Sequence, residues 1–261
     1  IEGILPAMHI EGAGYASVIA QLIMALLSIY YLLVKTTFSL KVSLTLNKEI
    51  KTFSLMILNL FVRTLALNIT LYYASAFSTS YGKEYIAAYT IAINLWFLGA
   101  FIIDGYSSAG NILSGKLFGQ ENYQALLRLS SKLIKYGIIL GISMAIIGGL
   151  FYEIIGTVFT KDPKVLHEFY QVFWIILLMQ PLCALAFIFD GVFKGLGKMK
   201  YLRNVLLFST FMVFLPLLFW LDSMNYKLYG IFIAFTAWII ARGVPLIIKF
   251  RQQFSLLSQK V

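Results

Sequence analysis

The sequence predicts an all-α integral membrane protein with about seven transmembrane helices. Of its 261 residues, 60% are hydrophobic and 12% are charged, whereas soluble domains are about 45–50% apolar and about 25% charged. The apolar residues gather in runs long enough to cross a hydrocarbon core about 30 Å thick, which takes ~20 helical residues. The runs do not alternate with a period of two, so helices rather than a β-barrel satisfy their backbone groups.

Polar segments between the runs predict the orientation of the chain. In chain order, the seven runs cover residues 12–34, 52–77, 84–108, 132–152, 166–189, 203–221 and 228–248. Fifteen cations follow the first, third, fifth and last runs, namely Lys35, Lys41, Lys48, Lys51, Lys116, Arg128, Lys132, Lys135, Lys194, Lys198, Lys200, Arg203, Lys249, Arg251 and Lys260. The other side has four: Lys83, Lys161, Lys164 and Lys227. By the positive-inside rule, the C-terminus is predicted to be cytoplasmic and residue 1 to lie outside.

The net charge of +10 does not indicate a nucleic-acid partner, because the cations lie in the short connections and form no basic stripe. An enzyme is not indicated either. The segment Gly191–Lys198 superficially resembles a phosphate loop, but its glycine spacing is wrong and Met199 stands where Ser or Thr is required. A metal site is not predicted, since His9 and His167 have no Cys or carboxylate at ligand spacing. The single cysteine, Cys183, excludes an internal disulfide.

Small residues mark the ends and the packing faces of several runs. The third run leads into Ile103–Gln120, in which Asp104 is followed by glycines at regular spacing. We expect this stretch to leave the membrane on the cytoplasmic side, where small residues allow close backbone approach. The fifth run ends in a similar way, with Asp190 and Gly191. In the fourth run, a ridge of small residues every four positions predicts a close-packed helix face: Gly137, Gly141, Ala145 and Gly149.

Three motifs carry a resemblance to a known family. The stretch Asp104–Gly115, with Phe118-Gly119-Gln120 after it, resembles a signature loop of the multidrug and toxic compound extrusion (MATE) family, and more closely its DinF-type branch. Phe189–Asn204 is similar to a later cytoplasmic loop of that family, and Gly12–Gln21 to the entry of its sixth helix. The resemblance implies one helix plus the six-helix C-terminal lobe of a twelve-helix transporter, that is, helices six to twelve.

The resemblance also implies a domain organisation and a function. Residues 1–50 would form the last helix of the N-terminal lobe and a cytoplasmic linker, residues 51–250 the C-terminal lobe, and residues 251–261 a cytoplasmic tail. The implied activity is efflux of a small organic, often cationic, substrate by antiport against H⁺ or Na⁺, without another cofactor. The implied location is the lipid of a bacterial inner membrane.

Two features keep other interpretations open. Ile1 is not an initiator Met and no signal peptide precedes the first run, so we expect an N-terminal lobe to be missing. The chain would then be a truncated, non-transporting fragment, or a half-transporter that needs an N-terminal partner. A lipid-linked saccharide flippase of the same superfamily is a further alternative, and it predicts a more cationic cavity than Arg63 alone supplies.

Five residues are candidates for binding substrate or ion: Arg63, Asn68, Asn94, Asp104 and Gln180. Arg63 lies deep in the second run, where a cation needs a partner or water. We expect Asp104, in the adjacent run, to be that partner. The three amides are the polar residues predicted nearest the membrane midplane, although amides in lipid also serve as contacts between helices.

Five further residues are candidates for a hinge or gate: Gly105, Asn111, Pro181, Asp190 and Gly191. Asn111 stands where the DinF-type branch usually has Glu, so this chain lacks a titratable group there. Pro181 frees a backbone carbonyl and permits a bend in the middle of its helix. Asp104 and Asp190 have an alternative, structural role, in which each marks the end of its helix.

Overall fold

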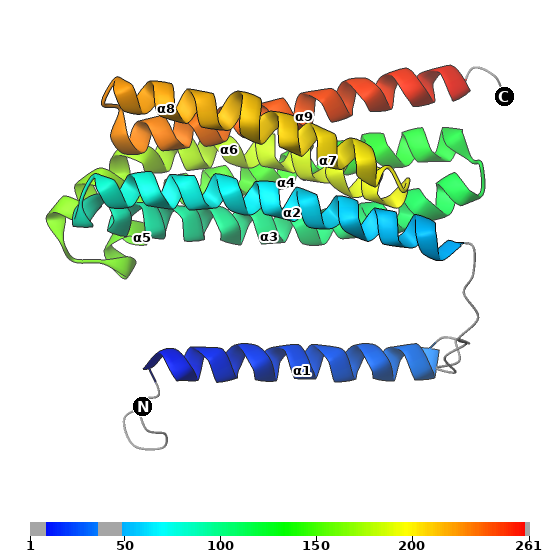
Figure 1. The fold of residues 1–261 in the computed structure, drawn as a ribbon, viewed down its shortest axis with the longest axis horizontal. Helices are drawn as coiled ribbons and strands as arrows, with labels where there is room; N and C mark the ends of the chain where they lie inside the picture. The colour runs from blue at the N-terminus through cyan, green and yellow to red at the C-terminus, as the bar shows by residue number, and fades with distance from the viewer. Residues whose placement is uncertain (1–8, 36–48, 259–261) are drawn as a thin grey trace. The chain divides into compact units, whose positions relative to one another are not determined.

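The computed structural model describes residues 9–35 and 49–258, so Ile1, Lys41, Lys48 and Lys260 lie outside the described residues. The chain divides into two units, Ile1–Lys48 and Glu49–Val261, and each is described by itself. The first unit contains α1 (His9–Lys35), drawn in blue in Figure 1. Its segment Gly14–Lys35 has a mean hydropathy of 2.2 and is long enough to span a membrane. The side chain of His9 is outside the described set.

The second unit is a bundle of long helices (Figure 1). Its described elements are α2 (Glu49–Ser80), α3 (Lys83–Gly119), α4 (Tyr123–Leu150), α5 (Tyr152–Phe159), α6 (Pro163–Gly195), α7 (Met199–Phe208), the π-helical turn η1 (Ser209–Phe214), α8 (Leu215–Ser223) and α9 (Lys227–Ser258). Among the described residues, seven helical segments are long and apolar enough to cross a membrane. This confirms the predicted fold class.

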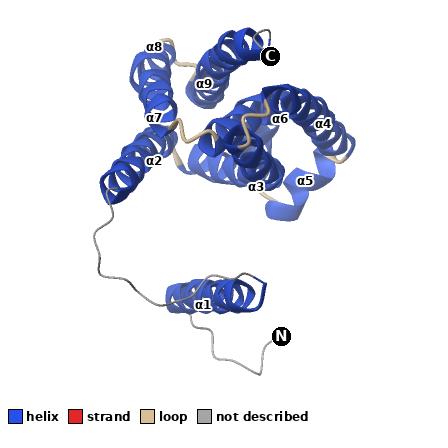
Figure 2. Cartoon of the chain, turned by 90° about the vertical axis from the view of Figure 1, so that its right-hand side faces the viewer, coloured by secondary structure: helices blue, strands red, loops and turns tan. Residues whose placement is uncertain are grey.

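Helix α6 lies at the centre of the six-span unit. It packs most extensively against α3, and then against α4 and α9. Two thirds of its most apolar 18-residue window (67%) is buried, which explains why this run is almost continuously apolar. Viewed from the end, α3, α4 and α6 lie together on one side, α2, α7 and α8 on the other, and α9 adjoins both groups (Figure 2).

The small-residue stretch that follows the third run is helical, which corrects the predicted loop. Helix α3 continues to Gly119 and α6 continues to Gly195, so Gly105, Asn111 and Gly191 all lie inside helices. A Cβ added at Gly191 would overlap Ser107, and one at Gly195 would overlap the carbonyl oxygen of Asn111. Close packing of α3 on α6 therefore requires Gly191 and Gly195. The packing offsets their low helix propensity, which costs roughly 1 kcal/mol for each glycine in a helix.

The glycine ridge of α4 is confirmed for two of its members. A Cβ at Gly141 would come within 2.8 Å of the Cα of Pro181, and one at Gly137 would overlap the side chain of Ile188. Gly149 has nothing within 4 Å of such a Cβ, so it does not contribute to this contact. Pro181 lies within a helix that runs unbroken from Pro163 to Gly195, and α4 crosses α6 beside it.

The sixth span contains a π-helical turn that the sequence analysis did not predict. It runs from Ser209 to Phe214 and is followed at once by α8, whose second residue is Pro216. The hydroxyl of buried Thr210 hydrogen-bonds the hydroxyl of Thr70 on α2 at 3.1 Å, and it accepts a hydrogen bond from the indole of Trp238 on α9 at 3.1 Å. This one residue therefore joins three elements in the apolar interior.

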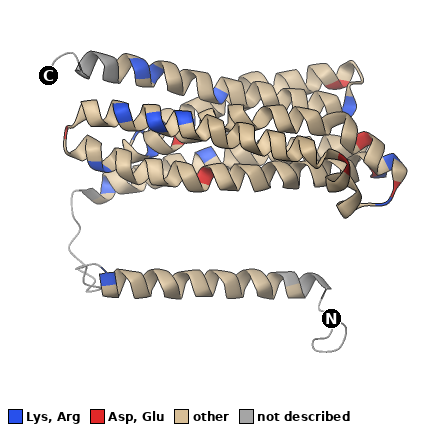
Figure 3. Cartoon of the chain, turned by 180° about the vertical axis from the view of Figure 1, so that it is seen from behind, with Lys and Arg blue, Asp and Glu red and all other residues tan. Residues whose placement is uncertain are grey.

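Charges segregate between the two ends of the bundle. Lys and Arg gather at the end where α9 terminates, and the acidic residues are found mostly at the other end (Figure 3). This is the asymmetry from which the orientation was predicted. A few charged side chains also lie midway along the helices, and these form the candidate site.

Candidate functional site

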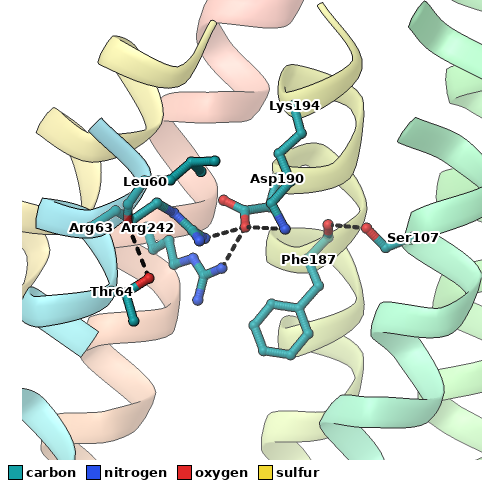
Figure 4. A network of polar contacts seen from close by, with 8 residues as sticks. All are labelled: Leu60, Arg63, Thr64, Ser107, Phe187, Asp190, Lys194 and Arg242. Carbon is teal, nitrogen blue, oxygen red and sulfur yellow. Dashed lines mark hydrogen bonds and ion pairs between the residues drawn. The ribbon is translucent and has the colours of Figure 1, made fainter. Parts of the chain in front are cut away.

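Four charged residues meet between α2, α6 and α9. Asp190, on α6, accepts hydrogen bonds from Arg63 on α2 and from Arg242 on α9, the latter at 2.8 Å (Figure 4). Lys194, one turn further along α6, places its ammonium nitrogen 3.7 Å from the same carboxylate. All three cations contact the same oxygen, Oδ2. The side chain of Asp190 is 5% exposed, so this is a buried ion cluster within membrane-length helices.

The partner of Arg63 is thus Asp190, and the prediction that it pairs with Asp104 was wrong. Asp104 is exposed and has no hydrogen bond or ion pair with any residue that the structure describes. The prediction chose the neighbouring span in sequence, but the central helix of the bundle is α6. The long Arg63 side chain reaches Asp190 from α2 (Figure 4), and this contact offsets the cost of placing a cation among apolar helices.

Arg242 is a site residue that the sequence analysis missed. It lies within the last apolar run, 228–248, and is 5% exposed. The same signal that identified Arg63, a cation deep in an apolar run, was present here. Its guanidinium carbon lies 4.9 Å from the ring centre of Phe187 and 5.6 Å from that of Trp238. These distances are within cation–π range, so the two rings help to hold the guanidinium in place.

The ion cluster opens onto a cleft of about 250 Å³. Its wall combines aromatic rings with charges of both signs, and Asp104 is part of it. The lining residues are Arg63, Leu67, Leu71, Trp96, Phe97, Ala100, Phe101, Asp104, Phe187, Asp190, Lys194, Trp238 and Arg242. An apolar concave surface with a few convergent polar groups is the usual form of a small-molecule site.

The three predicted amides do not line this cleft. Asn68 and Asn94 are exposed, and each donates its side-chain N–H to the carbonyl oxygen one turn earlier, at 3.0 Å to Thr64 and 2.8 Å to Thr90. Gln180 is buried on α6 against Gly99 of α3, and its Oε1 has no hydrogen-bond partner in the described part of the chain. The described contacts of all three amides lie outside the ion cluster, whereas Arg63, Asp104 and Asp190 share one cleft.

The cleft lies among helices long and apolar enough to cross a membrane, an arrangement compatible with a multi-pass membrane transporter. The model of the MatE family matches residues 59–220. The chain therefore belongs to the MatE family, as its three motifs predicted. Members of this family are transporters rather than enzymes. The match does not test the DinF-type branch, which stays a prediction.

Solved structures show the same fold. One is an outward-facing multidrug resistance MATE family transporter of the MOP superfamily, with a TM-score of 0.82 and 19% identity, covering 95% of this chain and 57% of that one. Another is a MOP superfamily transporter from Pyrococcus furiosus, for which a binding pocket of reversed polarity is described. It has a TM-score of 0.82 and 18% identity, covering 95% of this chain and 57% of that one.

Curated relatives come from Arabidopsis thaliana. DETOXIFICATION 42 is 29% identical over 160 residues, which is 61% of this chain and 31% of that protein. The chloroplastic DETOXIFICATION 45 is 28% identical over 159 residues, which is 59% of this chain and 28% of that protein. The matches thus span about a third of these relatives and 57% of the matched structures.

Proposed function

We propose that the chain is the C-terminal portion of a secondary active efflux antiporter that exchanges a small organic cation for H⁺ or Na⁺. The observation that carries this proposal is Asp104. It is an exposed carboxylate on the wall of an aromatic cleft, and no described residue pairs with it. The other carboxylate of the cleft, Asp190, is already engaged by three cations.

A carboxylate that has no hydrogen bond or ion pair with any described residue supports exchange, because it binds one cation at a time. An organic ammonium group at Asp104 excludes a proton or a sodium ion from the same oxygens, and the reverse holds. The rings of Phe97 and Phe101, stacked with centroids 5.9 Å apart, belong to the same wall. Aromatic faces attract organic cations by about 0.5–2 kcal/mol, so they favour an aromatic or quaternary cation over a metal ion.

The test is exchange in proteoliposomes with ethidium as the transported cation. We expect an imposed proton or sodium gradient to drive ethidium movement, and Asp104→Asn to abolish it. Glu84→Gln, which removes a carboxylate from the same helix outside the cleft, should leave the rate unchanged. Full exchange in the folded Asp104→Asn variant contradicts the proposal.

The same assay distinguishes whether the chain transports by itself, needs an N-terminal lobe or does not transport. The assay is run with the chain alone and with the protein encoded by the complete reading frame that contains it. Exchange only by the longer protein makes this chain a half-transporter that depends on its N-terminal lobe. Exchange by the chain alone makes it sufficient, and exchange by neither makes it a non-transporting fragment.

We also propose the location predicted above, a bacterial inner membrane with the C-terminus in the cytoplasm. The segregation of cations to one end of the bundle supports the orientation. The curated relatives named above are plant proteins, so they do not support the bacterial assignment, which is a proposal.

A lipid-linked saccharide flippase is a second candidate that one observation favours. The cleft has three cations, Arg63, Lys194 and Arg242, where the sequence predicted one. A saccharide lipid carries its sugar on phosphate groups, and several convergent cations suit such a substrate. Loss of ethidium exchange together with binding of a lipid phosphate would select this candidate.

A further inference from the structure

The cleft contains more positive than negative charge, and part of that charge lacks a partner. Three cations share one oxygen of Asp190. The Nε atoms of Arg63 and Arg242 are buried and have no hydrogen-bond partner among the described residues. Both arginines line the cleft, and the side chain of Arg242 is only 6% exposed. Buried donors without acceptors are rare in folded proteins, so these two call for an explanation.

The unpartnered groups specify the chemistry of the missing partner. A guanidinium group only donates hydrogen bonds, and its planar fork matches the two oxygens of a carboxylate or phosphate. Asp190 supplies one oxygen to the three cations, which leaves donor capacity on both arginines. Phe187 and Trp238 stack on Arg242, so the group is held in one place before a ligand arrives.

We propose that Arg63 and Arg242 form a subsite for an oxyanion group, a carboxylate or a phosphate, of the molecule that enters the cleft. The inference rests on the proposed function in that it describes the same cleft, and it adds a feature of the substrate. A molecule that fills the cleft carries an oxyanion toward Arg63 and Arg242, an aromatic or apolar body against Trp96 and Phe97, and a positive group toward Asp104. The substrate class is therefore amphoteric rather than purely cationic.

Binding to the purified chain in detergent micelles, measured by isothermal titration calorimetry, tests the subsite. The probe is naphthalene-2-carboxylate, and its control is naphthalene-2-carboxamide, which has the same ring without the charge. We expect the carboxylate to bind at least about tenfold more tightly, because charge-assisted hydrogen bonds are roughly twice as strong as neutral ones. Equal affinity of the two probes overturns the proposal.

Variants of Arg63 test whether its guanidinium contributes to the binding. Arg63→Lys keeps a cation beside Asp190 but loses the planar fork, so the carboxylate should bind several-fold more weakly. Arg63→Gln should weaken it further. Arg203→Gln is the control, since that guanidinium is hydrogen-bonded to Asn59 and Asn204 away from the cleft. Unchanged affinity in folded Arg63→Lys and Arg63→Gln overturns the assignment.

Asp190→Asn gives a prediction of the opposite sign. The amide still accepts hydrogen bonds from both arginines, but it removes the negative charge that competes with a bound oxyanion. We expect naphthalene-2-carboxylate to bind several-fold more tightly to this variant. If Asp190 had only a structural role, the variant would bind the probe more weakly or not at all. Weaker binding by a variant whose melting curve is intact counts against the subsite.

Two sources of the oxyanion are distinguished by competition. Micelles containing phosphatidic acid, or added inorganic phosphate, compete with the probe if a phosphate group enters the subsite, and a lipid source is indicated when only phosphatidic acid competes. Binding of the carboxylate without competition by either indicates a soluble organic acid. Ethidium exchange reports on Asp104 and probe binding on the arginines, so the antiport proposal and the subsite can fail separately.

Discussion

At the scale of single residues, the buried carboxylate of Asp190 is the feature on which the site depends. It compensates two guanidinium groups and an ammonium group within apolar helices. Breaking such a cluster by removing one partner costs more than the pair contributes, because an uncompensated charge remains in the interior. Asp104 has the same chemistry but no ion pair among the described residues, so it is not needed for stability.

Asp190→Ala should therefore destabilise the folded chain by about 3–5 kcal/mol. Asp104→Ala should change the free energy of unfolding by less than about 1 kcal/mol, as expected for an exposed side chain without a partner. Thermal and denaturant unfolding in detergent measure both. Equal effects of the two substitutions would show that Asp190 is not the centre of the ion cluster.

At the scale of helices, the crossing of α3 and α6 depends on small residues. Ser107 donates its hydroxyl hydrogen to the carbonyl oxygen of Phe187 at 2.6 Å, which requires close backbone approach. Gly191 faces Ser107 at this point, whereas a Cβ at Gly105 meets nothing within 4 Å. The two glycines lie in similar sequence motifs, yet only Gly191 is required by packing.

The two glycines make a matched pair of substitutions with opposite expected signs. Gly191→Ala should destabilise the chain by about 1–3 kcal/mol, because the added methyl overlaps Ser107. Gly105→Ala should stabilise it by about 0.4–1 kcal/mol, because alanine has the higher helix propensity and open space is available. Unfolding free energies measured in the same detergent compare them. Stabilisation by Gly191→Ala would be incompatible with the close α3–α6 contact.

At the scale of the whole molecule, the distribution of charge predicts the orientation in the membrane. The cation-rich connections should face the cytoplasm, and the connections at the other end should face outward. Lys198 lies between α6 and α7, and Lys161 lies between α5 and α6. The two positions fall on opposite sides if each long helix spans the membrane once.

Single cysteines at these positions test the orientation. The native Cys183 is buried, and a Cys183→Ala background removes it as a source of labelling. A membrane-impermeant maleimide added to intact cells should label Lys161→Cys but not Lys198→Cys, and it should label both after lysis. Labelling of Lys198→Cys in intact cells reverses the predicted topology.

The sequence by itself determined the class, the number of spans and the family. Length and hydropathy of the runs are local properties, and a bilayer of fixed thickness converts them into helices without reference to tertiary contacts. Arg63 was found for the same reason, since a cation deep in an apolar run is conspicuous in one dimension. Arg242 carried an equal signal, and counting only the cations of the connections missed it.

Only the tertiary structure decided which charges meet and which glycines are packed. Arg63 pairs with Asp190, 127 positions away in the sequence, because α6 rather than the adjacent α3 occupies the centre of the bundle. The stretch from Gly105 to Gly119 stays helical and packed because Ser107 and Gly115 fit against α6 and Gly110 fits against α4, contacts that local glycine content cannot reveal. Pairing and packing depend on how helices are placed around one another, and that placement is set by long-range fit rather than by the composition of any one run.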